Sequence, residues 1–321
     1  MRISFKAVRA AMLRTLKKEG VSMMHSRVIL SFALILMLCG LGVSWAQDQG
    51  SEEVRGAFLS SREKTGSTKP RNRTPRRPSP AKKTNTNSST NLNTGKTNAN
   101  NDSDGGTTSP GPAAIGLGYT LFMRDTNGDA VRVDPSEEFH TGERVRITLE
   151  PNVDGYLYIF HSEGDGPPQM IFPDWRLQDG DNAIEAHVPY EVPASFEKDE
   201  RLRWFTFDSN PSTEHLHIVV TREPLADVPT GDALKTFCAT NKTKCPWKPA
   251  PEMWAKVQEA AKADVEVVAS TNYGQPQTDK EKVATTRGLG LDQTAPAPSV
   301  IRMSASTKAP VLVTVLDLIH K

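Results

Sequence analysis

Two histidines near the middle of the chain have the spacing of metal ligands. His215 and His217 lie two residues apart in the β-branched stretch 214–221. Residues two apart on a strand point to the same face of a sheet, so both imidazoles could reach one ion, with His187 or Glu185 adding a ligand from a neighbouring strand. The alternative interpretation is two surface histidines on the polar face of a strand. These weak metal candidates keep a metal-dependent hydrolase as the third of three functional hypotheses.

Three aromatic residues form the other candidate site. Trp175, Tyr190 and Trp204 could provide an interaction surface on which sugar rings stack, which is typical of a carbohydrate-binding module. In a β-sandwich such residues pack more often in the core or at an edge. The chain contains no nucleophile elbow, no phosphate-binding glycine loop and no helical zinc-protease motif. We therefore predict no catalytic residue, no cofactor and no enzymatic activity.

Cys238 and Cys245 are the cysteines that remain once a predicted signal peptide is removed. In an oxidising compartment two cysteines at this short spacing most simply form one disulfide. Zinc would need two further ligands, and none lies close by in the sequence.

Short apolar runs separated by turn residues dominate the chain after residue 115. The run 144–150 alternates apolar and polar residues, which predicts a half-buried antiparallel strand. The run 156–160 is apolar on both faces, which predicts a central strand, joined in a hairpin to 169–173. A final strand is expected at 311–319. Turn signals recur about every ten residues, so we predict an all-β fold, an antiparallel β-sandwich.

The start of the chain has the features of an export signal. An apolar run at 28–43 follows basic residues and precedes Ser44-Trp45-Ala46, which predicts a signal peptide at 1–46 that is cleaved after Ala46. The alternative is an uncleaved membrane anchor, which would be the chain's one attachment to a membrane. Both interpretations place the protein outside the cytoplasm, in the periplasm or at the cell surface.

Composition divides the rest of the chain. Residues 47–114 are rich in Asn, Ser, Thr, Pro and basic side chains, which predicts a disordered linker. The β-sandwich domain is expected at 115–321, with a small helical insertion at about 226–300 that includes a helix from Pro251. The net charge is +1, but acidic residues outnumber basic ones after residue 115. A nucleic-acid partner is therefore disfavoured.

Several motifs together resemble a bacterial domain family of unknown function, numbered forty-three eighty-four. They are Gly-Glu-Arg-Val-Arg at 142–146, Asp-Gly-Tyr-Leu-Tyr-Ile-Phe at 154–160, Ile-Phe-Pro at 171–173 and Glu-His-Leu-His-Ile-Val-Val at 214–220. The similarity covers roughly Gly118 to Leu225. It implies an immunoglobulin-like β-sandwich on a secreted or envelope-associated protein, and it transfers no catalytic residue.

Our first functional hypothesis is therefore an exported, non-catalytic β-sandwich that contacts an envelope protein or a cell-wall polymer. It rests on the export signal, the long linker and the missing catalytic motif. The sequence indicates neither the identity of the partner nor the oligomeric state.

Overall fold

The computed structural model describes residues 46–64, 113–176 and 178–321. The chain divides into two compact units, Met1–Glu53 and Val54–Lys321, and all described strands belong to the second unit. The predicted signal peptide, up to residue 45, lies outside the described residues, as does linker stretch 65–112. Within the described ranges, no helix is both long enough and apolar enough to span a bilayer.

Sheet 1 has seven strands in the order β11-β12-β1-β4-β8, with β2 paired to β1 and β9 paired to β4. All of its pairings are antiparallel. Its strands are β1 (Gly116–Arg124), β2 (Ala130–Arg132), β4 (Arg144–Pro151), β8 (Tyr190–Val192), β9 (Phe205–Thr206), β11 (Val265–Ala269) and β12 (Val300–Ser304).

Sheet 2 has six strands in the order β3-β13-β10-β5-β6, with β7 paired to β5. Its pairings are antiparallel except for the short parallel pair of β3 and β13. Its strands are β3 (Glu138–Phe139), β5 (Gly155–Glu163), β6 (Gln169–Phe172), β7 (Ala183–Ile184), β10 (Thr213–Thr221) and β13 (Val311–His320).

The main core lies where the two sheets face each other. Leu121 and Ile147 of sheet 1 and Ile159 and Ile218 of sheet 2 are at most 1% exposed and belong to one cluster. The prediction of β5 as a central strand is confirmed. It pairs with β10 on one side and β6 on the other, and successive residues, which point to opposite faces, are buried. The predicted strand at the end of the chain is confirmed as β13, which pairs with β10 over residues 311–319.

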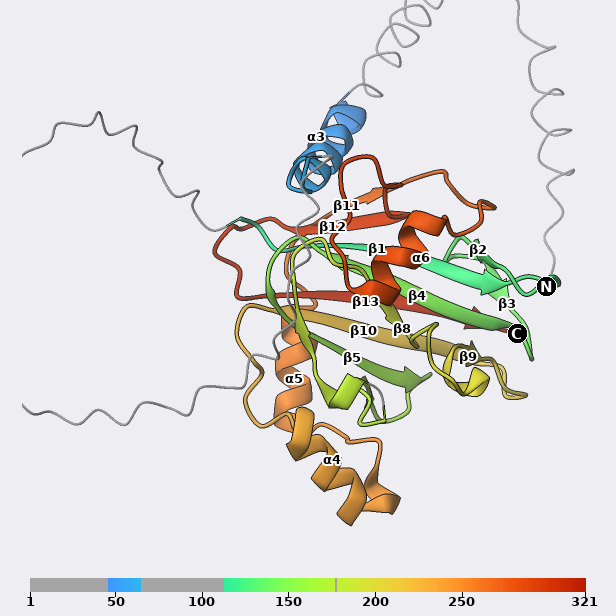
Figure 1. Ribbon diagram of the computed structural model, residues 1–321. Coiled ribbons are helices and arrows are strands. Elements are labelled where there is room, and N and C mark those ends of the chain that lie inside the picture. The colour runs from blue at the N-terminus through green and yellow to red at the C-terminus, as the bar shows by residue number, and fades with distance from the viewer. Residues whose placement is uncertain (1–45, 65–112, 177) are drawn as a thin grey trace, which may run out of the picture. The chain divides into compact units, whose positions relative to one another are not determined.

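Helices cover the outer face of sheet 2. In Figure 1, helix α5 (Pro251–Ala260) lies beside β5 and β10, and helix α4 (Gly231–Thr240) lies below it. Leu234 and Val257 from these helices pack against Tyr158 and Phe160 of β5. The predicted disulfide between Cys238 and Cys245 is confirmed, and it connects α4 to the turn that leads to α5. The helix predicted from Pro251 is confirmed as well.

The outer face of sheet 1 is covered by residues 271–299, which we call the strap. The strap contains α6 (Asp279–Arg287), which begins with a capping box between Thr278 and Glu281. The prediction of a half-buried β4 is therefore wrong, because Arg146 and Glu150 on its polar side are 5% and 3% exposed. An all-β fold is also wrong: the chain is a two-sheet, mixed α/β structure with four α-helices among the described residues.

The predicted disordered linker at 47–114 must be corrected at its start. Helix α3 occupies Ala46–Ser60, and residues 61–64 continue from it. Val54 and Phe58 lie four residues apart, so they share one helix face, and both are buried. This apolar pair gives the segment a surface to bury, which the neighbouring polar sequence lacks.

Candidate functional site

The Arg62 side chain is enclosed by groups from two distant parts of the chain. Its Nε and Nη2 atoms donate to Glu150 Oε1 and Oε2 at 2.7 and 2.6 Å. Nη1 donates to the carbonyl oxygens of Ala295 at 2.9 Å and Asp292 at 3.4 Å, and Nη2 also donates to Pro296 O at 3.1 Å. Arg62 is 2% exposed. We call the four acceptor residues the arginine socket; together they accept all five guanidinium N–H groups.

The socket is formed by β4 and the strap. The alternation of β4 directs Ile147 and Leu149 into the core and Glu150 to the opposite face. A turn of the strap supplies the three carbonyl oxygens. In that turn Asp292 Oδ1 accepts hydrogen bonds from the backbone N–H and the hydroxyl of Thr294, at 2.9 and 2.7 Å. A hydrogen bond from Lys280 Nζ, followed by the bonds from Thr294, lowers the pKa of Asp292 to about 2.

The ring of Phe58, a residue in the last turn of α3, occupies an apolar pocket. The side chain is completely buried and clusters with Val54, Val268 and Ile301. The ring packs over Gly118, where an added Cβ would lie 3.1 Å from Phe58 Cζ and 2.4 Å from Cγ of Pro298. Glycine is therefore required for this close approach. We call Gly118, Val268, Ile301 and Pro298 the phenyl pocket.

Ser61, His187 and Glu150 form a row of side-chain contacts between the phenyl pocket and the arginine socket. Ser61 Oγ lies 2.8 Å from His187 Nε2, and His187 Nδ1 lies 2.9 Å from Glu150 Oε1. Because the Glu150 carboxylate accepts, His187 Nδ1 carries a proton. Ser61 Oγ is also 2.6 Å from the carbonyl oxygen of Phe58. A cavity of about 80 Å³ opens beside Ser61 and His187.

His187 is held in a backbone conformation that few non-glycine residues adopt. Its φ angle is 58°, in the left-handed region. Its N–H donates to Pro151 O at 2.6 Å and its carbonyl accepts from Leu291 N at 2.8 Å. The Phe58 ring contacts the imidazole edge-on, with ring centroids 5.5 Å apart. The strained loop thus presents His187 to the α3 segment.

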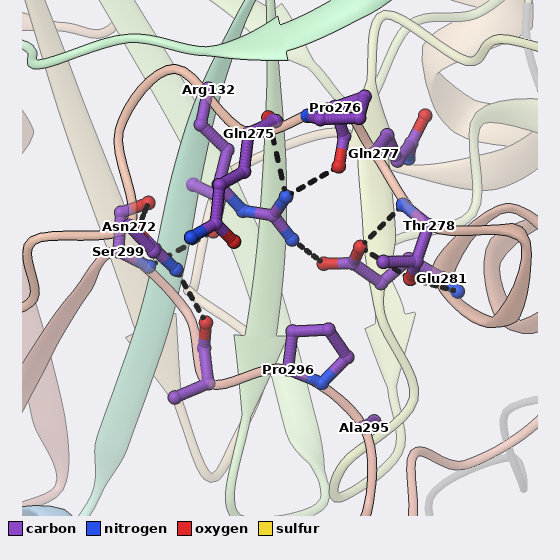
Figure 2. Close-up of polar contacts among 12 residues, drawn as sticks. Arg132, Asn272, Gln275, Pro276, Gln277, Thr278, Glu281, Ala295, Pro296 and Ser299 are labelled. Carbon is purple, nitrogen blue, oxygen red and sulfur yellow. Dashed lines mark hydrogen bonds and ion pairs between the residues drawn. The ribbon is translucent and has the colours of Figure 1, made fainter.

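Further buried charges attach the strap to sheet 1. Figure 2 shows the Arg132 guanidinium between Glu281 Oε1, at 2.6 Å, and the carbonyl oxygen of Pro276, at 2.7 Å. Gln277 connects Arg146 and Glu191, with bonds of 3.2 and 2.5 Å. Burial lowers the pKa of Arg146 from its usual value, while Glu191 acts in the opposite direction. These contacts hold the strap, and with it three of the four socket residues, against the sheet.

The predicted metal candidates are not brought together with further ligands. His215 and His217 share a face of β10 as expected, but His215 Nδ1 pairs with Asp317 Oδ1 at 2.7 Å. His217 packs against Trp254, with ring centroids 4.7 Å apart. His187, the expected third ligand, instead contacts Glu150. Within the described ranges no three His, Cys, Asp or Glu side chains are grouped to hold a metal.

The aromatic surface is also not formed. Tyr190 and Trp204 are buried at 8% and 9% exposure, whereas Trp175 is 41% exposed. The ring of Trp204 lies under the guanidinium of Arg146, whose Cζ is 4.3 Å from the ring centroid. The alternative interpretation, packing in the core, therefore describes Tyr190 and Trp204.

Sequence reasoning missed Phe58, Arg62 and Glu150. The one available signal was the apolar pair Val54 and Phe58 at helical spacing, followed at the same spacing by Arg62. Glu150 ended an alternating strand and was assigned to the solvent face.

A family model matches part of the chain. Neither the search of curated proteins nor the search of solved structures found a similar chain. Residues 138–224 match the family described as Domain of unknown function (DUF4384), somewhat less than the expected range of 118–225. The matched range includes Glu150 and His187, whereas Arg62 and the strap lie outside it. The chain thus contains a DUF4384 domain at residues 138–224, and the arginine socket combines one residue of that domain with three residues that follow it.

Proposed function

We propose that this protein is an exported, non-catalytic interaction module that binds protein segments at the phenyl pocket and the arginine socket. The observation that carries the proposal is the seating of Arg62, whose five N–H groups all meet acceptors in a buried site. Export is part of the same proposal, and it is supported by the apolar run at 28–43 with its basic leader and the small residues after it.

The contacts have the composition of a peptide-recognition site. An aromatic anchor in a pocket and a fully hydrogen-bonded arginine are the residue types that dominate binding energy at protein interfaces. Phe58 lies in the last turn of α3, which ends at Ser60, and Arg62 follows two residues later, so a helix with an aromatic residue in its last turn and an arginine just after its end satisfies both contacts. A protein partner in the cell envelope fits this chemistry better than a wall polymer does. We further propose that the two sheets have the immunoglobulin-like arrangement that the family resemblance implies.

The experiment uses the full chain with Phe58→Ser and Arg62→Ser, which empties the site. A fluorescent peptide of residues 46–64 is titrated with this variant, and binding is followed by anisotropy. We expect saturable binding that weakens at least roughly 30-fold when the peptide carries Arg62→Ser, as for an interface hot spot. The matched control peptide carries Arg55→Ser, because Arg55 makes one exposed contact, with Ala269 O at 3.2 Å. Equal binding of both peptides, or none by the native peptide, contradicts the proposal.

One observation favours a second function. Ser61, His187 and Glu150 follow the order of a serine hydrolase triad beside a cavity. Ser61 Oγ would bond to an ester carbonyl carbon while its proton passes to His187 Nε2 and then to the departing alkoxide; water would release the acyl group. We rank this second, because Glu150 is shared with Arg62 and the hydroxyl has a backbone acceptor. Labelling by a fluorophosphonate probe, mapped to Ser61 by mass spectrometry and lost in His187→Gln, would establish it.

A further inference from the structure

Residues 54–63, which we call the plug, are separated from their binding site by a long stretch of chain. Residues 65–112 connect the plug to β1. At about 3.3–3.6 Å per residue this connection can span at most roughly 170 Å. A domain of this size has a radius of gyration of roughly 17 Å. The connection is long enough for the plug to reach the same site on a neighbouring copy.

We infer that a second copy of this chain is a partner for the site, and that copies exchange plugs. The inference rests on the proposed function and names its partner. The contacts that hold Arg62 and Phe58 join the plug to Glu150, Gly118 and the strap. Each of them can form between two copies with unchanged geometry, so exchange needs no new complementary surface. This is the general reason that a detachable segment permits swapping.

Competition within one copy decides when exchange is seen. A tethered segment has an effective concentration of at most roughly millimolar at its own site. At about 10 μM protein, the plug of the same copy therefore has an advantage of roughly 100-fold over one from another copy. We expect the native chain to be monomeric in dilute solution. Exchange is expected when a copy's own plug or site is damaged, or when copies are concentrated.

Two complementary variants of the full chain isolate the exchange. The first, Phe58→Ser with Arg62→Ser, keeps an intact site and loses its plug. The second, Glu150→Lys, keeps an intact plug and repels the guanidinium at the socket. Gly118→Val serves as an alternative to Glu150→Lys, because its side chain meets Pro298 and Phe58. Thermal denaturation establishes that each variant is folded before mixing.

The variants are analysed alone and mixed at about 10 μM by native mass spectrometry. We expect monomers for each variant alone and a 1:1 heterodimer for the mixture. Replacing the site-damaged partner by native chain should weaken heterodimer formation roughly 100-fold, because the native plug is held by its own copy. If the plug-damaged chain forms no heterodimer with Glu150→Lys and none with Gly118→Val, the inference is overturned. If the free peptide still binds the plug-damaged chain, the proposed function stands and only the second copy is excluded as partner.

Discussion

Replacement of Arg62 by alanine tests the energetic role of the arginine socket. The change removes five hydrogen bonds and leaves Glu150, which is 3% exposed, with His187 as its remaining charged or titratable contact. Removing one partner of a buried ion pair costs about 3–5 kcal/mol when the other stays buried. Detachment of the plug would hydrate Glu150 but would expose Phe58, whose burial contributes about 1.5–3 kcal/mol. We therefore expect the free energy of unfolding to fall by about 3 kcal/mol.

Urea denaturation followed by tryptophan fluorescence measures this loss. Arg62→Lys keeps the charge, but a single ammonium group cannot reach all the acceptors of the arginine socket. We therefore expect the free energy of unfolding to fall by about 1–2 kcal/mol. The matched control is Arg55→Ala, a surface change on the same helix that should stay within about 0.5 kcal/mol of the native chain. Equal stability of Arg62→Ala and Arg55→Ala would refute the reasoning.

Three further changes test other parts of the structure. Gly118→Val should lower the free energy of unfolding by about 1–3 kcal/mol, because the added atoms overlap Pro298, and thermal denaturation measures it; an unchanged melting temperature would speak against the phenyl pocket. The pKa of Asp292, lowered to about 2, predicts that its contribution to stability is complete above about pH 4 and is lost as the pH falls towards 2. Asp292→Asn should reduce this acid dependence of the unfolding midpoint, whereas identical pH profiles would contradict the assignment. Cys238→Ser should destabilise the chain by about 2–3 kcal/mol through loss of the bond to Cys245, and a reductant should destabilise the native chain but not the variant.

The β-sandwich core could be predicted because its signal is local. Residues 156–160 and 311–316 are apolar on both faces, and such runs suit strands that are covered on both sides. The sequence did not predict that the strap covers the outer face of sheet 1. Arg146 and Glu150 alternate with apolar residues as on a solvent-facing strand, and the strap that buries them is itself polar in sequence.

The candidate site could not be predicted for a related physical reason. Arg62 is one of many basic residues near a disordered-looking stretch, and its pairing with Glu150 depends on a contact between residues 88 positions apart. The sequence cannot select that pair among the many other acidic and basic residues. The aromatic hypothesis failed similarly, because Trp204 lies beneath the guanidinium of Arg146, which comes from a distant part of the chain. Faces that are closed by distant segments leave no periodic signal.

The most direct test of the account is whether the Phe58 ring lies against sheet 1 in solution. A nuclear Overhauser effect is sought between the Phe58 ring protons and the α protons of Gly118 in the full-length chain. The account predicts a strong cross-peak, because a Cβ on Gly118 would lie 3.1 Å from Phe58 Cζ, and it predicts that Arg62→Ala weakens the peak. A native chain without this cross-peak, with Phe58 shifts typical of a solvent-exposed ring, would contradict the docking of the plug and the functional proposal based on it.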